Sequence, residues 1–284
     1  KLVFKDLRGN IDTRLKKFMN SANDGIVVAK AAIDRIMKTN DVNISLKNEI
    51  QSCFSSCNWM VLPLSLYPTA PGQGAIGIEV REDNLEVVDI IKKINSEIDF
   101  QNVLKERKIM SEYGGGCSQK IGVSIWEKNG NLIQSLSGVT ENGKILKFYS
   151  TINRTKPFKA KGISSDNIFP KNKKERLIYK RFDLNKNDTI KNIKKRIIYL
   201  SRKNVVKHDP VFDKSCILWT SGHKTWEHAV NKGYWINGSS DSLGEDEIKK
   251  IMTLFDVKYS IIKLTFTGDN STQRNIIDTY RLGK

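Results

Sequence analysis

The sequence lacks any long apolar run. Of its 284 residues, 39% are hydrophobic and 28% are charged, and no stretch approaches the roughly 20 apolar residues that are needed to cross a bilayer. We therefore expect no membrane partner. An initiator methionine and a signal-peptide pattern are also missing, because the chain opens at Lys1 inside a segment with the pattern of folded structure. We expect a fragment whose natural N-terminus lies upstream, and a cytoplasmic protein.

Cysteine is scarce, and its spacing argues against two kinds of structure. The four cysteines are irregularly placed for a chain of this length, which favours a reducing compartment over a disulfide framework. Cys53 and Cys57 have a Cys-x3-Cys spacing without a second pair, and the three histidines lie far away in the sequence. We therefore expect no metal site.

A nucleotide-binding loop is missing as well. The run from Thr69 to Glu79 contains a Pro-Gly turn and further glycines that lead into a strand pattern. It lacks the Gly-Lys-Ser or Gly-Lys-Thr ending of a phosphate loop. On its residues alone, this run is a tight turn.

Negative charge is in short supply, and the formal net charge is +17. Residues 171–207 hold 14 Lys and Arg against three acids, so most of the excess is local. A field of this sign favours anionic partners, and one hypothesis is a non-catalytic module that binds nucleic acid or an anionic surface through 171–207. Such a module needs aromatic platforms among its basic residues, and only Tyr179, Phe182 and Tyr199 are present. We favour a solvated face and do not expect nucleic acid as a partner.

The first hundred residues show strand and helix patterns in turn. Residues 26–29 predict a short buried strand that leads into a helix. The prolines between 63 and 71 predict a crossover or hinge between domains. Residues 75–80 alternate with period two and predict a strand, and residues 85–94 return to helical spacing.

From Ile121 onward the pattern changes to hairpins. Three strand patterns, joined by two turns that contain Asn-Gly, predict a small antiparallel sheet with at least one helix against it; they cover 121–126, 132–139 and 144–149. The lysine-rich stretch that follows includes a predicted amphipathic helix near residues 190–200. A strand at 216–219 opens a further α/β segment that runs to the C-terminus.

Cys117 follows a predicted helix and three glycines. The helix covers 97–112, with Phe100, Val103 and Leu104 on its expected buried side. The glycines leave the thiol with almost no steric cover, which suits attachment of a bulky group to sulfur. Glycines also end helices where φ turns positive, and Cys117 would then be a small buried residue. The residues alone leave both interpretations open.

Arginines supply the other candidate binding groups. Arg8 and Arg14 lie six residues apart around Gly9, and guanidinium groups offer paired N–H donors that suit carboxylates and phosphates. The alternative is a surface loop with two solvated arginines. Taken alone, Arg35 and Arg107 are ordinary surface residues.

Taken together and in this order, these segments resemble porphobilinogen deaminase, also called hydroxymethylbilane synthase, over about residues 1–160. Five motifs carry the resemblance: Arg8-Gly9-Asn10 with Thr13-Arg14, Asp24-Gly25-Ile26 leading to Arg35, Ala70-Pro71-Gly72-Gln73-Gly74-Ala75 with Gly77-Ile78-Glu79, Glu106-Arg107, and Gly115-Gly116-Cys117-Ser118 with Ile121-Gly122.

The resemblance implies a transferase of haem biosynthesis. Cys117, next to Gly116, would carry a dipyrromethane cofactor through a thioether, and the carboxylate-binding set would be Arg8, Arg14, Arg35 and Arg107. Four porphobilinogen molecules would be condensed stepwise onto the cofactor to give hydroxymethylbilane. The partners would be porphobilinogen and its linear oligomers. Because each pyrrole ring bears two carboxylates, a growing chain needs a cleft lined with fixed cations, which agrees with four arginines from separate segments.

The expected fold class is α/β. We expect a partial periplasmic-binding-protein-like α/β domain, then a small α+β domain with a three-stranded antiparallel sheet and helices, and then a C-terminal α/β extension. The expected boundaries are 1–66 for part of the central α/β domain, 67–96 for the hinge and the return strand and helix of the first α/β domain, 97–160 for the cofactor-carrying domain, 161–210 for a lysine-rich linker and 211–284 for the extension.

Two features set this chain apart from the family: the absence of the family's first domain and the character of the C-terminal region. The resemblance places the catalytic aspartate, with the first domain, before Lys1, so we expect this chain to be inactive without that segment. Residues 218–222 and 279–282 also resemble pieces of uroporphyrinogen-III synthase, which suggests a fusion of the two activities. Only 74 residues follow Pro210, too few for both lobes of that enzyme. The alternative is an accessory domain with a polar loop at 239–244.

Overall fold

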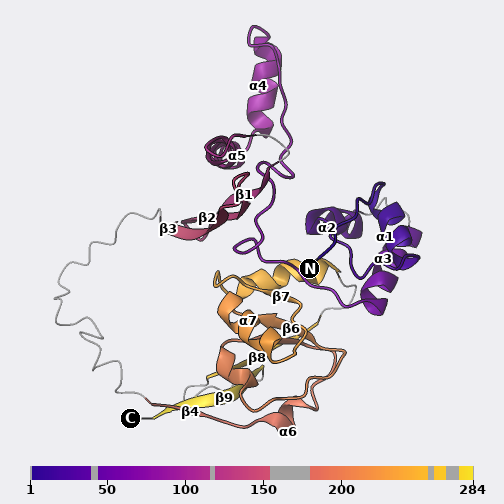
Figure 1. Cartoon of the computed structure of the whole chain (residues 1–284), viewed down its shortest axis with the longest axis vertical. Helices are drawn as coiled ribbons and strands as arrows, with labels where there is room; N and C mark the ends of the chain where they lie inside the picture. The colour runs from indigo at the N-terminus through magenta and orange to yellow at the C-terminus, as the bar shows by residue number, and fades with distance from the viewer. Residues whose placement is uncertain are drawn as a thin grey trace, which may run out of the picture. The chain divides into compact units, whose positions relative to one another are not determined.

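The computed structural model describes residues 2–39, 44–115, 119–153, 180–254, 259–266 and 275–283. The chain forms two compact units (Figure 1), which are described separately below. Unit 1 consists of residues 1–61 and 172–284, and unit 2 of residues 62–171. No helix in these described ranges is both long enough and apolar enough to span a membrane.

Unit 1 begins with three helices: α1 (Ile11–Met19), α2 (Lys30–Lys38) and α3 (Ile44–Ser56). Each helix buries one isoleucine or leucine: Leu15, Ile33 and Ile50 respectively. The turn before α1 requires glycine, since Gly9 has a φ of +124° and a Cβ there would lie 2.9 Å from Cγ2 of Thr13. The start of α1 is thereby fixed by the Arg8-Gly9-Asn10 motif.

Residues 26–29 do not form the buried strand that we predicted. They are an irregular segment before α2, and Val27 is 76% exposed. A strand needs a neighbour that satisfies its backbone groups, and within the described ranges no strand pairs with these residues. The apolar run is present in the sequence, but the prediction that it forms a buried strand was wrong.

The second part of unit 1 is a six-stranded sheet of order β4-β9-β8-β5-β6-β7. All neighbouring strands are parallel except β4 and β9. The elements are β4 (Lys180–Asp183), α6 (Asn187–Ile190), β5 (Ile197–Leu200), the 3₁₀ helix η3 (Lys203–Val206), β6 (Ile217–Thr220), α7 (His223–Asn231), β7 (Gly238–Ser239), the 3₁₀ helix η4 (Glu245–Leu254), β8 (Ile261–Phe266) and β9 (Ile276–Gly283). The expectation of an α/β segment towards the C-terminus is confirmed.

The amphipathic helix predicted near residues 190–200 is wrong. α6 ends at Ile190, and Ile197–Leu200 is a fully buried strand between β6 and β8. A short apolar run cannot be assigned to helix or strand from its period alone, and the β-branched isoleucines favour the strand. Two segments of the range expected to be a linker, Lys180–Asp183 and Ile197–Leu200, are therefore strands of this sheet.

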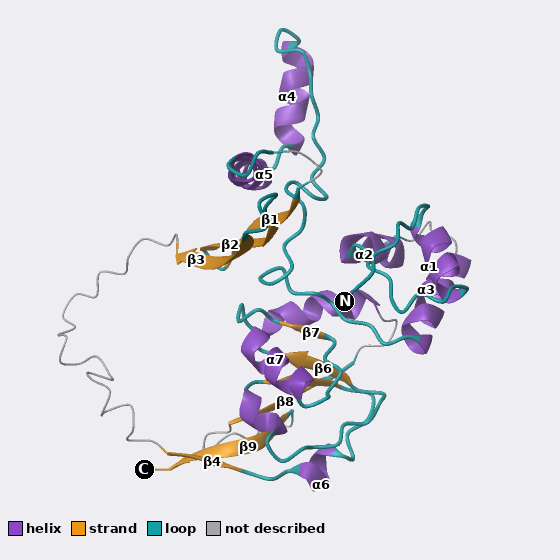
Figure 2. Cartoon of the chain, viewed as in Figure 1, coloured by secondary structure: helices purple, strands orange, loops and turns teal. Residues whose placement is uncertain are grey.

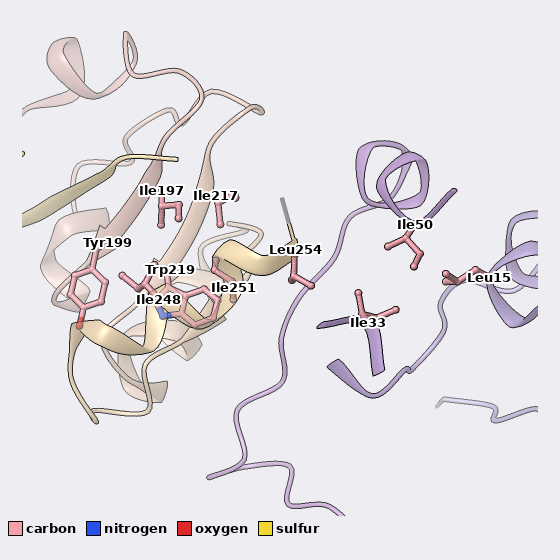
Figure 3. Close-up of a cluster of buried hydrophobic side chains, with 10 residues drawn as sticks. All are labelled: Leu15, Ile33, Ile50, Ile197, Tyr199, Ile217, Trp219, Ile248, Ile251 and Leu254. Carbon is pink, nitrogen blue, oxygen red and sulfur yellow. The ribbon is translucent and has the colours of Figure 1, made fainter. Parts of the chain in front are cut away.

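One hydrophobic core joins the helices and the sheet of unit 1. It contains ten buried residues, which Figure 3 shows as sticks: Leu15, Ile33, Ile50, Ile197, Tyr199, Ile217, Trp219, Ile248, Ile251 and Leu254. Asn237 adds polar contacts, because its Nδ2 donates to the Trp59 carbonyl at 2.9 Å and its carbonyl accepts from the Val61 N–H at 2.8 Å. Residues 1–61 are thus tied to the C-terminal sheet by both packing and hydrogen bonds.

Unit 2 contains a three-stranded antiparallel sheet with the order β1-β2-β3 (Figure 2). Its elements are α4 (Leu85–Ile94), α5 (Glu97–Ser111), β1 (Lys120–Lys128), β2 (Asn131–Val139) and β3 (Ile145–Asn153). The first hairpin turns at Asn129 and Gly130, both with positive φ, as the Asn-Gly pair predicted. The mixed α/β class with this sheet and its helices is confirmed.

Two details of unit 2 differ from expectation. Residues 75–80 form no strand, and Ile76 is 90% exposed; as at 26–29, no strand in the described ranges pairs with them. α5 does not bury Phe100 and Leu104, which are about half exposed. Its buried side consists of Asn102, Glu106 and Met110. The buried side of α5 is therefore not the apolar side that the sequence pattern predicted.

Candidate functional site

Arg14 is the predicted site residue with the most telling surroundings. It lies on α1 beside the buried Leu15 and is itself half-buried. Its Nε is buried and has no hydrogen-bond acceptor among the described residues. An unsatisfied buried donor is costly, and an oxyanion is the natural partner of a guanidinium N–H. The side chain is therefore suited to receive a carboxylate.

Arg8 and Arg35 are brought into the same unit as Arg14, and both are exposed. Arg8 immediately precedes the turn into α1, and Arg35 is on α2. No described acidic residue forms an ion pair with any of these three arginines. Their positive charges are therefore available to a ligand.

A shallow groove of about 430 Å³ runs along α1, and the sequence did not indicate it. It is lined by Asp12, Thr13, Lys16, Lys17 and Asn20. Lys16 forms an ion pair with Glu49 at 3.1 Å. Lys17, whose Nζ donates to the Arg8 carbonyl at 3.1 Å, adds positive charge beside Arg8. None of the predicted arginines lines the groove.

In unit 2 a buried carboxylate holds the Pro-Gly-Gln-Gly turn against the sheet. Oε2 of Glu106 accepts the Gly72 N–H at 2.7 Å, and Oε1 accepts the Ile125 N–H at 2.7 Å. Glu106 is only 8% exposed. Thr69 continues the attachment, because its carbonyl accepts from the Val123 N–H at 2.8 Å. One side chain thus connects α5, the turn and β1.

Glycines make this close approach possible. Gly72 has a φ of +70°, and a Cβ at Gly122 would lie 2.3 Å from the Pro68 carbonyl oxygen. A Cβ at Gly72 would lie 3.9 Å from Nε of Arg107, which is exposed. Arg107 is therefore brought next to the turn, which the sequence pattern did not predict. Glu106 was noted only as the neighbour of Arg107, and the signal that could have revealed it is an acid on the buried side of a helix.

Cys117 and Gly116 lie outside the described residues. On one side of them, α5 is followed by Gly114 and Gly115, both with positive φ. This confirms that these glycines end the helix, one of the two interpretations of the run. On the other side, β1 begins at Lys120. The proposed attachment residue therefore lies in a short connection between two elements that Glu106 also links.

Two other cysteines have raised thiol pKa values. Burial raises the pKa of the Cys53 thiol, and the neighbouring Cys57 and Glu49 add to the effect. Burial also raises the pKa of Cys216, although backbone hydrogen bonds oppose it. Because the thiolate is the attacking form, neither of these two residues competes well as an attachment point.

Comparison with known proteins shows a likeness in the first part of the chain. Residues 1–89 match the family model described as "Porphobilinogen deaminase, dipyromethane cofactor binding domain". The matched range contains Arg8, Arg14 and Arg35 and ends before Cys117. This part of the chain is therefore similar to that cofactor-binding domain, while the attachment residue stays a prediction.

Curated relatives show a similar likeness. The probable porphobilinogen deaminase of Picrophilus torridus is 38% identical over 122 residues, which is 43% of this chain and 37% of the relative. The porphobilinogen deaminases of Nitratiruptor sp. and Nostoc sp. are 33% identical over 148 residues and 35% identical over 130 residues, covering 51% and 46% of this chain and 42% and 35% of the relatives. The chain thus spans about two fifths of their length. The matched part of the chain is thus similar to porphobilinogen deaminases. None of these matches supports the expected similarity to uroporphyrinogen-III synthase.

Proposed function

We propose that this chain is part of a hydroxymethylbilane synthase, a transferase that condenses four porphobilinogen molecules into a linear tetrapyrrole. The observation that carries the proposal is Arg14, whose buried Nε has no described acceptor and which lies inside the range matched by the cofactor-binding family. A guanidinium that is held half-buried by its helix costs stability unless an oxyanion binds it. A ligand with several carboxylates supplies that acceptor.

The residues fit a dipyrromethane. Two pyrrole rings with two carboxylates each need several fixed cations, and Arg8, Arg14 and Arg35 have no described acidic partner. When it is bound, the group supplies the pyrrole carbon to which porphobilinogen is joined, with loss of ammonia at each condensation. The chain's own contribution is to bind carboxylates through the arginines and to supply the thiol of Cys117, which falls between α5 and β1 in the sequence. The division of the chain into the five predicted domains stays part of this proposal.

Activity of the full-length protein tests the proposal directly. We expect porphobilinogen to be consumed with release of one ammonia per molecule, and the tetrapyrrole product to appear at one quarter of that amount. Ammonia can be measured by a coupled assay, and the product by its absorbance after cyclisation and oxidation. A correctly folded full-length protein that consumes no porphobilinogen would refute the proposal.

Replacing Arg14 by alanine is expected to raise the KM for porphobilinogen by about tenfold to a hundredfold, the effect of losing one charge-assisted hydrogen bond in a shielded position. Arg14→Lys should recover only part of this, because an ammonium lacks the guanidinium fork. Arg81→Ala is the matched control, because Arg81 is in the same matched range and is already paired with Asp83. Equal KM values for Arg14→Ala and Arg81→Ala would exclude a binding role for Arg14.

The alternative function, an anionic-surface module built on residues 171–207, is less well supported. Several of the described lysines in this segment are already paired with acids: Lys186 with Asp278, Lys191 with Asp188, and Lys207 with Asp183. These pairs lower the charge that remains for a large anionic surface. We therefore keep the enzyme as the proposed function.

A further inference from the structure

The C-terminal sheet of unit 1 has a topological switch point. β5 is central, β6 and β7 follow on one side, and β8 and β9 lie on the other. All five strands are parallel, so their carboxyl ends share one edge. In open sheets of this kind, ligands bind outside the carboxyl ends where the strand order reverses. Here that position is between β5 and β8.

Two arginines converge near this edge on one aromatic ring. The guanidinium of Arg202, which follows β5, lies 5.9 Å from the ring centroid of Tyr280 on β9. It therefore extends from β5 past β8, the strand between them. The guanidinium of Arg181, on β4, lies 4.9 Å from the same centroid. Tyr280 is buried and stacks on Phe266, the last residue of β8.

Hydrogen bonds fix the backbone just before Arg202 against β8. Ser201 donates to the Leu264 carbonyl through its hydroxyl at 2.7 Å and through its N–H at 3.3 Å. Both bonds tie the end of β5 to β8. The start of the Arg202 side chain is therefore placed at the switch point by the fold and does not depend on a flexible loop.

The pairing of β4 with β9 decides which groups share the face of Tyr280. Asp183 lies opposite Tyr280, and Arg181 lies opposite Leu282; because side chains alternate along a strand, Arg181, Asp183 and Tyr280 share one face. Arg281 is on the other face, where its guanidinium lies 5.7 Å from the ring centroid of Phe182. The sheet thus carries two similar arginine–aromatic pairings, one on each face.

Asp183, the acid opposite Tyr280, is already neutralised. Asp183 accepts from Nζ of Lys207 at 2.6 Å and from Nδ2 of Asn204 at 3.0 Å, and the hydrogen bond from Lys207 holds its pKa below the usual range. No described acidic residue forms an ion pair with Arg181 or Arg202. Two like charges that face one ring repel each other, and a bound anion would remove that repulsion.

We propose that Arg181 and Arg202 form a binding site for a small multivalent oxyanion on the face of Tyr280, at the carboxyl edge of the C-terminal sheet. The guanidinium groups supply paired N–H donors, and they lie 4.9 Å and 5.9 Å from the centroid of the same buried ring. Polycarboxylates and polyphosphates share the chemistry that such a site recognises. This site is independent of the proposed condensation reaction, because it lies outside the matched range.

Calorimetric titration of the full-length protein tests the site, with pyrophosphate and citrate as probes at constant ionic strength. We expect at least one probe to bind, and we expect Arg202→Ala and Arg181→Ala each to weaken that binding by at least about tenfold. Arg281→Ala is the matched control, since it removes the same kind of pairing on the opposite face. The affinity of Arg281→Ala for the probe should stay within about twofold of the wild type. This is well below the roughly tenfold change expected from the loss of one charge-assisted hydrogen bond.

Each result has a defined meaning. Tighter binding of citrate identifies a polycarboxylate ligand, and tighter binding of pyrophosphate identifies a polyphosphate. Arg202→Lys is the second variant in case alanine disturbs the sheet edge; it keeps the charge but loses the fork, so we expect weaker binding with an unchanged unfolding temperature. Failure of both probes to bind, or equal losses in Arg281→Ala and Arg202→Ala, would overturn the proposal.

Discussion

Replacing Cys117 by alanine is expected to remove the entire mass of a dipyrromethane from the full-length protein. The thioether needs a sulfur atom, and alanine offers no other nucleophile at that position. Intact-mass spectrometry of the purified protein is the measurement. The wild type should carry the added mass in nearly every molecule, and the variant in none. Condensing activity should disappear together with the mass, because each product chain grows on the cofactor.

The controls for this experiment are the other cysteines. Burial raises the pKa of Cys53 and of Cys216, so Cys53→Ala and Cys216→Ala should retain the full adduct. The experiment also separates attachment from mere helix termination, since a cysteine that only fills space would carry no added mass. An active wild-type protein without any adduct, or an adduct that persists in Cys117→Ala, would refute the assignment.

Local turn chemistry explains which parts of the fold could be predicted from the sequence. The three strands of unit 2 and their order follow from short segments joined by Asn-Gly turns, in which the backbone conformation of two residues sets the pairing. Asn129 and Gly130 adopt the positive φ values that such a turn needs. The ends of α4 and α5 were likewise predicted to within a residue or two, because their spacing and caps are local.

Elements that depend on distant partners could not be predicted in this way. Residues 26–29 and 75–80 have the right pattern for strands, but a strand forms only against another strand, and no described strand lies beside them. The opposite error occurred at Ile197–Leu200, which becomes a strand because β6 and β8 flank it. Sequence pattern therefore shows where apolar residues gather, but whether they form a buried strand depends on a partner strand from elsewhere in the chain.

The candidate site divides in the same way. Arg8, Arg14 and Arg35 were found through a resemblance of ordered motifs, and the comparison over residues 1–89 supports that part of the resemblance. The orphaned Nε of Arg14 is a property of the folded helix and is invisible in the sequence. Arg181 and Arg202 lie 21 positions apart. The pairing of β4 with β9 brings Arg181 to Tyr280, and the order β5-β8-β9 brings Arg202 there.

Removing the carboxylate of Glu106 is expected to destabilise unit 2 by about 3 kcal/mol. Glu106→Ala leaves the N–H groups of Gly72 and Ile125 without their acceptor, and each buried unsatisfied donor costs roughly 1–3 kcal/mol. Glu106→Gln should fall between wild type and alanine, because an amide has only one acceptor oxygen and turns its NH₂ group towards the second N–H. Denaturant unfolding of the full-length protein measures the loss.

Hydrogen exchange locates the effect and distinguishes it from general damage. In Glu106→Ala we expect the amides of Gly72 and Ile125 to lose protection first, while the β2–β3 pairing keeps its own. Glu112→Ala is the control, because Glu112 is exposed at the end of the same helix and should change stability by no more than about 0.5 kcal/mol. Because β1 and α5 also bracket Cys117, a loosened turn should lower the fraction of protein that carries the cofactor. A loss below about 1 kcal/mol, less than one unsatisfied buried donor, together with unchanged protection at Gly72, would show that Glu106 does not hold the turn.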